Sequence, residues 1–223
     1  MDLDSGLTEE IRKYCADLGV DVVGFADPEL FNRFPRENRP EFFLETTKTV
    51  IVIGIHLDDL ILDTWYFDQE SGKNFQFADS ILNNYCYRMR NFLIKKGYSS
   101  KVIPYSPGFF LKDSAALAGI GFIGKNNLLI TEKFGPQIRL RALVTAAPLE
   151  HDKPVLESKY CENCSKCIDA CPAKALKSGK YSKDACYPYQ ISHLRQLSAK
   201  TAVWCNICID ACPVGKRTGS AFS

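Results

Sequence analysis

The sequence predicts an α+β protein: an N-terminal α/β domain with a mixed sheet over residues 1–156, and a small C-terminal module over residues 157–223. Two observations lead to this prediction. Residues up to about 156 alternate between helical and strand-like hydrophobic patterns. Beyond residue 160 this periodicity fades and most of the 10 cysteines gather, namely Cys161, Cys164, Cys167, Cys171, Cys186, Cys205, Cys208 and Cys212.

The first helix and strand are predicted near the start of the chain. Ile11, Cys15 and Leu18 recur at helical spacing, which predicts an amphipathic helix over residues 8–18. Gly19 can end this helix in the left-handed conformation. A β-branched stretch over residues 20–25 predicts the strand that follows.

The middle of the N-terminal part predicts a buried strand and a long helix. Residues 50–55 form a continuous β-branched run, which is typical of a strand buried on both faces. An apolar stripe over residues 78–96 predicts the longest helix, with Gly97 as its stop signal. A short strand is expected at residues 102–105.

The last elements before the cysteines suggest that the sheet is mixed. A short helix is expected over residues 112–117, before a glycine-rich turn. Residues 127–131 and 138–146 read as strands, and Gly135-Pro136 between them predicts an antiparallel hairpin.

Composition and charge narrow the class of protein. A content of 46% hydrophobic and 24% charged residues is typical of a globular protein. No apolar run approaches the roughly 20 residues of a membrane helix, and the acidic, polar start does not resemble a secretory signal. We therefore expect a cytoplasmic protein with no membrane partner. A net charge of +2 gives no reason to expect a nucleic-acid partner.

The cysteines form two related motifs. The first reads Cys161-x2-Cys164-x2-Cys167-x3-Cys171-Pro172, and the second reads Cys205-x2-Cys208-x3-Cys212-Pro213. The first is the run of bacterial ferredoxins, in which three cysteines bind one 4Fe–4S cluster and the fourth binds the other. The second lacks a leading cysteine, and Cys186 is the spare thiol nearby.

Four ligands for each of two 4Fe–4S clusters give one economical partition. The first cluster takes Cys161, Cys164, Cys167 and Cys212, and the second takes Cys171, Cys186, Cys205 and Cys208. The C-terminal module is thus expected to be ferredoxin-like. Structural zinc is the alternative, but zinc sites usually use two separated ligand pairs. We expect Cys15 and Cys86 to be buried on helix faces.

A glycine block resembles two phosphate-binding patterns. Residues 119–126 match G-x-G-x-x-G and, except for a final Asn126, the P-loop pattern. Both patterns need a strand before the loop and a helix after it, whereas the order predicted here is the reverse. We therefore expect Gly119, Gly121 and Gly124 to let the backbone approach another strand or a flat cofactor.

The glycine block and the cysteine motifs together resemble a known family. The stretch Lys112-Asp-Ser-Ala-Ala-Leu-Ala-Gly-Ile-Gly-Phe-Ile-Gly-Lys-Asn-Asn-Leu-Leu-Ile130, followed by both motifs, is similar to epoxyqueuosine reductase and its shorter iron–sulfur relatives. That family is related to the corrinoid-dependent reductive dehalogenases. The resemblance implies a cobalamin between an α/β domain and a ferredoxin-like module whose clusters reduce the cobalt. The tRNA-modifying members continue with a helical-repeat domain, whereas this sequence stops at Ser223.

The resemblance also implies site residues and partners. Where the tRNA-modifying members have an aspartate as proton donor, this sequence has Tyr105, and the related dehalogenases use a tyrosine. Cofactor contacts are expected from Ser106, Gly119, Gly121, Gly124, Lys125 and Asn126. An oxidoreductase is expected, with a ferredoxin-type or flavodoxin-type electron donor and a corrinoid or small-molecule substrate. The alternatives are an electron carrier without its own substrate and a short tRNA-modifying reductase.

Overall fold

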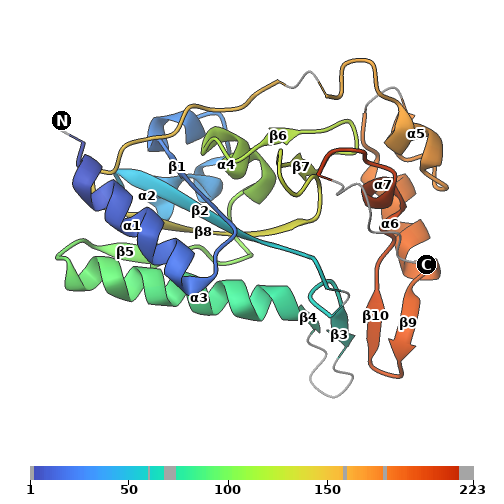
Figure 1. Ribbon diagram of the computed structural model, residues 1–223, viewed down its shortest axis with the longest axis horizontal. Coiled ribbons are helices and arrows are strands. Elements are labelled where there is room, and N and C mark those ends of the chain that lie inside the picture. The colour runs from blue at the N-terminus through green and yellow to red at the C-terminus, as the bar shows by residue number, and fades with distance from the viewer. Residues whose placement is uncertain (1–2, 60, 68–73, 158–159, 178–179, 216–223) are drawn as a thin grey trace. The chain divides into compact units, whose positions relative to one another are not determined.

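The computed structural model describes residues 3–59, 61–67, 74–157, 160–177 and 180–215 (Figure 1). The chain divides into two compact units, each of which combines separate stretches of sequence. Unit 1 contains residues 1–55, 81–121 and 139–156, and unit 2 contains residues 56–80, 122–138 and 157–223. The predicted boundary near residue 156 coincides with the end of unit 1, but unit 2 also includes two earlier segments.

Unit 1 is built on a four-stranded sheet. Its strands, in spatial order, are β1 (Val22–Ala26), β2 (Thr49–His56), β8 (Ile138–Thr145) and β5 (Ser100–Val102). The pairs β1–β2 and β5–β8 are antiparallel. Next to β2, the Lys48 amide donates to the Thr145 carbonyl, and the Leu57 amide donates to the Gln137 carbonyl. These crossed positions make β2 and β8 antiparallel as well.

The prediction of a mixed sheet is therefore wrong for these strands. It depended partly on the continuous apolar run in β2, which is buried along almost its whole length. Such a run signals burial on both faces and does not fix the strand direction. Helices cover both faces here, so an antiparallel strand carries the same pattern.

The helices of unit 1 lie on opposite faces of the sheet. From α1 (Ser5–Leu18), the Arg12 guanidinium lies 4.5 Å from the centroid of the Phe25 ring. The next strand residue, Gly24, points the other way, where a Cβ would lie 2.0 Å from the Ala118 carbonyl oxygen at the end of α4 (Leu111–Leu117). Helix α1 also stacks Tyr14 on Phe92 of α3 (Phe77–Lys95), with ring centroids 4.5 Å apart.

The predicted helices and most of the strands are confirmed, with shifted ends. Helix α1 begins earlier than expected because Asp4 caps it, accepting a hydrogen bond from the Leu7 amide at 2.8 Å. In α3 the buried face consists of Ala78, Leu82, Cys86, Met89 and Leu93. Short helical turns follow β1, namely η1 (Pro28–Phe31), η2 (Arg36–Asn38) and α2 (Pro40–Phe43).

Unit 2 contains a second sheet that the sequence did not predict. Its strands, in spatial order, are β4 (Asn74–Gln76), β3 (Trp65–Phe67), β10 (Thr201–Val203) and β9 (Arg195–Ser198). The helices of the cysteine-rich segment are α5 (Lys166–Ala170), α6 (Lys183–Ser192) and α7 (Ile207–Asp210). The β3–β10 pair is antiparallel and joins segments far apart in the sequence.

The predicted hairpin between residues 127–131 and 138–146 is wrong. Strand β7 (Leu129–Ile130) instead forms an antiparallel pair with β6 (Phe122–Ile123), the strand that precedes it in the sequence by one short turn. Thr131 forms only an isolated bridge to Gly135. The glycine-rich turn thus supplies a closer partner than the Gly135-Pro136 connection. None of the helices in the described residues combines the length and apolar character that a membrane crossing requires.

Candidate metal centre

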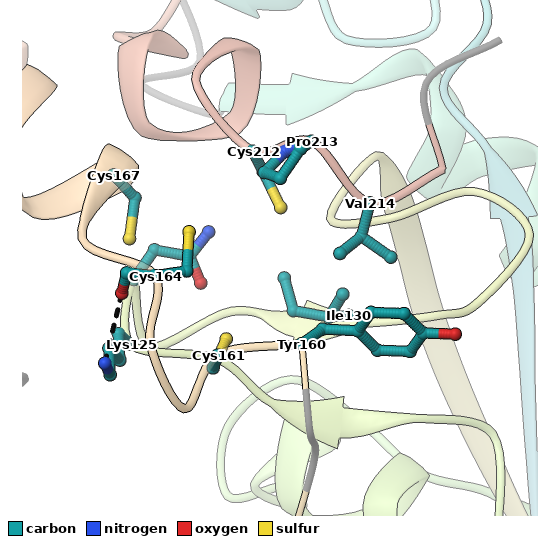
Figure 2. A pocket seen from close by; sticks show the side chains of 10 residues that line it. Lys125, Ile130, Tyr160, Cys161, Cys164, Cys167, Cys212, Pro213 and Val214 are labelled. Carbon is teal, nitrogen blue, oxygen red and sulfur yellow. Dashed lines mark hydrogen bonds between the residues drawn. The ribbon is translucent and has the colours of Figure 1, made fainter.

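Four cysteines of unit 2 line one pocket (Figure 2). They are Cys161, Cys164, Cys167 and Cys212. Figure 2 shows their sulfur atoms turned toward a common space, with Ile130 and Val214 beside it. These are the four cysteines that the motif spacing assigns to the first cluster.

Tight turns and short helices present these four thiols. The Cys164 amide donates to the Cys161 carbonyl at 3.3 Å, which closes a turn between the first two. Cys167 lies inside α5, and Cys212 follows α7, where its amide donates to the Ile209 carbonyl at 3.0 Å. The proline after Cys212 turns the chain away from the helix.

The three remaining motif cysteines, Cys171, Cys205 and Cys208, interact with one another and with Cys186. The thiol of Cys208 has Cys205, Cys171 and Cys186 among its electrostatic neighbours. Burial, together with the repulsion from these neighbouring thiols, raises the pKa of Cys208 to about 12. Burial also raises the pKa of Cys186, although a hydrogen bond from Tyr181 opposes that rise. Thiols packed in this way would repel one another as thiolates, and bound cations relieve that repulsion.

The ligand types of the two cysteine groups are compared with those of known metal sites. Within the described residues, no three His, Cys, Asp or Glu side chains converge closely enough to hold a single metal ion. A zinc site needs four ligands within about 2.3 Å of one ion. Donor sets made only of cysteine are typical of iron–sulfur clusters.

The glycine block is divided between the two units. Gly119, with φ +73°, belongs to unit 1, where a Cβ would lie 2.8 Å from the Cβ of Asp152. Gly121 is the last residue of that segment and is buried. Gly124, Lys125 and Asn126 lie in unit 2, in the turn between β6 and β7. Because a strand rather than a helix follows the turn, the rejection of a P-loop is consistent with the structure.

Lys125 and Asn126 both line the pocket of the first cysteine group. The Lys125 ammonium donates to the Glu162 carbonyl at 3.0 Å and to the Cys164 carbonyl at 3.1 Å. Asn126 is 4% exposed, and its side-chain oxygen accepts a hydrogen bond from the Leu128 amide at 3.2 Å. Sequence reasoning selected both residues for a corrinoid contact, which stays a prediction, and missed their place beside the cysteines.

Tyr105 lies in unit 1, beyond the end of the strand expected to contain it. Strand β5 ends at Val102, and Tyr105 follows in a bend with 52% of its surface exposed. The guanidinium carbon of Arg141 lies 4.0 Å from the centroid of its ring. Ser106, the next residue, is exposed.

Arg141 is a residue that sequence reasoning missed. It lies in β8 with 5% exposure, and its Nη2 donates to the side-chain oxygen of Asn83 at 3.0 Å. Its buried Nε finds no hydrogen-bond partner within the part of the chain that the structure describes. An arginine between Leu140 and Ala142 in a mainly apolar strand was the available signal, because charged side chains are rarely buried without a partner.

Cys15 and Cys86 lie in unit 1 and are 1% and 0% exposed, as predicted. Burial raises the pKa of each thiol to about 12. The Cys15 sulfur lies 3.6 Å from the sulfur of Met89. Both thiols therefore belong to the apolar core of unit 1.

Comparison with known proteins confirms the expected resemblance. The chain is 29% identical over 215 residues to an epoxyqueuosine reductase of Lactococcus garvieae, covering 82% of this chain and 60% of that enzyme. Over 99 residues it is 39% identical to a tetrachloroethene reductive dehalogenase of Desulfitobacterium hafniense, covering 44% of this chain and 18% of the dehalogenase. No protein-family model matches the chain.

The fold is also similar to solved structures. An epoxyqueuosine reductase in complex with a modified tRNA stem loop superimposes with a TM-score of 0.69 at 22% identity, over 94% of this chain and 65% of that one. The chain thus spans less than two thirds of the length of the epoxyqueuosine reductases that it matches. That enzyme binds a modified tRNA stem loop, a nucleic-acid partner of a kind that the net charge of this chain did not predict.

Proposed function

We propose that the protein is an iron–sulfur redox protein that passes electrons through two 4Fe–4S clusters to a corrinoid or another acceptor. One observation carries the proposal: the eight cysteines near the C-terminus fall into two groups. Four of them line a single pocket, and the thiol of Cys208 has the three remaining ones, Cys171, Cys186 and Cys205, among its neighbours. The similarity to epoxyqueuosine reductases and reductive dehalogenases supports a reductase-type function.

In this proposal one part of the chain binds the clusters and the other part binds the electron acceptor. Residues 157–223 hold both clusters, with the ligand partition given by the motif spacing. The N-terminal α/β domain, residues 1–156, holds the acceptor. Each cluster, when bound, supplies one-electron redox chemistry at a potential set by its surroundings. The protein's part is to hold the thiolates, exclude water from the pocket and fix the charges around it.

The proposal for the acceptor side assigns Tyr105 as proton donor. A reductive bond cleavage takes up a proton as well as electrons, so an acidic group must reach the substrate. The phenol of Tyr105 is half exposed in its bend, and the Arg141 cation lies over its ring. A cation at this position favours the phenolate that remains after proton transfer. The similarity to a reductive dehalogenase, a class that the sequence resemblance links to corrinoids, makes a corrinoid the first acceptor to test.

Metal analysis of anaerobically prepared protein tests the proposal. The expected result is about eight irons and eight acid-labile sulfides per chain, with a broad visible absorbance. Zinc at one or two ions per chain, without that absorbance, would contradict it. Titration with cobalamin then tests the acceptor, since saturable binding favours a corrinoid-dependent reductase. Iron and sulfide without cobalamin binding would favour an electron carrier that docks on a redox partner.

A second candidate function is a tRNA-modifying reductase. The observation in its favour is the similarity in fold to an epoxyqueuosine reductase in complex with a tRNA stem loop. RNA binding of this kind weakens steeply as salt rises, because phosphate contacts release counterions. Salt-sensitive binding of a tRNA stem loop would support this function, whereas equal binding at low and high salt would contradict it.

A further inference from the structure

Lys125 joins the glycine-rich turn to the first cysteine motif. Its ammonium donates to two carbonyl groups of the turn that contains Cys161 and Cys164, at 3.0 Å to Glu162 and at 3.1 Å to Cys164. Figure 2 shows the bond to Cys164 as a dashed line. Hydrogen bonds from a charged donor are stronger than neutral ones. They fix the peptide groups next to two of the four thiols in the pocket.

The turn that carries Lys125 is itself held firmly. The Gly124 amide donates to the Leu128 carbonyl at 2.9 Å, and the Asn127 amide donates to the Gly124 carbonyl at 2.8 Å. A Cβ at Gly124 would lie 2.8 Å from the Ile130 side chain and 2.9 Å from the Asn126 side chain, so both side chains would have to shift to admit one. The tight hairpin turn therefore fixes the backbone of Lys125. The ammonium at the other end of its side chain contacts the Cys161–Cys164 turn.

We infer that Lys125 is a positioning residue for the first cluster: it holds the Cys161–Cys164 turn and, through its charge, raises the reduction potential of the cluster bound there. This inference rests on the proposed function. A 4Fe–4S cluster takes up one electron on reduction, so its total negative charge increases by one. A fixed cation beside the pocket stabilises that reduced form more than the oxidised form. A hydrogen-bonded backbone turn also keeps the two thiolates at a constant spacing.

Three substitutions separate the charge from the hydrogen bonds. Lys125→Arg keeps the charge and the donors, Lys125→Gln keeps donors without the charge, and Lys125→Met removes both. Redox titration followed by electron paramagnetic resonance should show one of the two cluster potentials lowered in Lys125→Gln and Lys125→Met. We expect about a tenfold lower ratio of reduced to oxidised cluster at a fixed potential, which corresponds to about 59 mV for one electron. Lys125→Arg should stay close to the parent.

Amide hydrogen exchange measures how firmly Lys125 holds the Cys161–Cys164 turn, independently of the redox signal. The amides of residues 161–165 should exchange faster in Lys125→Met than in the parent. Lys133→Met is the matched control, because it removes a lysine of the same unit whose ammonium lies 4.7 Å from the centroid of the Phe134 ring. That variant should leave both the potentials and the exchange of residues 161–165 unchanged.

The outcomes distinguish this inference from the proposed function. If the parent binds about eight irons and Lys125→Met behaves like Lys133→Met in both measurements, the role of Lys125 is refuted while the proposed function survives. If the parent binds no iron, the proposed function and the effect on the potential both fail, and hydrogen exchange alone decides whether Lys125 holds the turn. A change in exchange without a change in potential would refute the electrostatic half of the inference.

Discussion

Replacing Gly135 by alanine should destroy the first cluster without touching a cysteine. Gly135 has φ +57°, and a Cβ there would lie 2.0 Å from the carbonyl oxygen of Val214, two residues after Cys212. An ordinary carbon–oxygen contact is about 3.4 Å, so the segment that carries Cys212 must move by about 1.4 Å. Metal–ligand distances tolerate only about 0.2 Å, so Cys212 should lose its place in the ligand set.

Gly97→Ala provides a matched control for backbone strain. Gly97 has φ +90°, and a Cβ there meets nothing within 4 Å. Both substitutions carry the cost of a left-handed alanine, about 1–2 kcal/mol, but only Gly135→Ala adds the collision. Iron analysis should give about four irons per chain for Gly135→Ala and about eight for Gly97→Ala. Eight irons in a folded Gly135→Ala protein would refute the packing argument.

Three further predictions concern single side chains. Cys186→Ser should leave about half the iron, because one of two four-thiolate clusters loses a ligand, and full iron content would overturn the partition. Cys15 and Cys86 should resist alkylation by iodoacetamide in the native protein at pH 8, because a pKa of about 12 leaves roughly one thiol group in ten thousand ionised. Rapid labelling of either cysteine, monitored by mass spectrometry, would contradict their burial. Tyr105→Phe should keep iron and any bound cobalamin but lose most turnover, and an unchanged rate would reduce Tyr105 to a surface aromatic.

The sequence was most informative where local chemistry decides the structure. The spacing of the motifs selects four cysteines, and the pocket of unit 2 contains the same four. Helix ends also followed local signals, as with Gly19, which ends α1 in the left-handed conformation. Burial of Cys15 and Cys86 could be predicted because helical periodicity alone fixes which face a residue occupies.

The sequence was least informative where distant segments choose their partners. Strand β7 could have paired with either neighbour, and the turn at Gly124 to Leu128 gave β6 the shorter loop to close. A continuous apolar run in β2 indicated burial but not direction, so the antiparallel sheet went unrecognised. Arg141 was missed because its partners, Asn83 and Tyr105, lie far from it in sequence.

The cysteine-rich segment, residues 157–223, makes many of its contacts with earlier parts of the chain. Strand β10 pairs with β3, and Trp204 packs on Trp65 with ring centroids 5.5 Å apart. The side-chain Nδ2 of Asn206 donates to the carboxylate of Asp63, within the same unit. Lys125 binds the first cysteine loop.

Residues 157–223 alone would lose all of these contacts and would retain little apolar core. We therefore expect that this fragment, reconstituted with iron and sulfide, binds far less iron than the full chain and shows little cooperative unfolding by circular dichroism. The full chain, treated identically, is the control. A fragment that holds about eight irons and unfolds cooperatively would show that cluster ligation supplies the folding energy without the strands β3 and β4 or the β6–β7 hairpin.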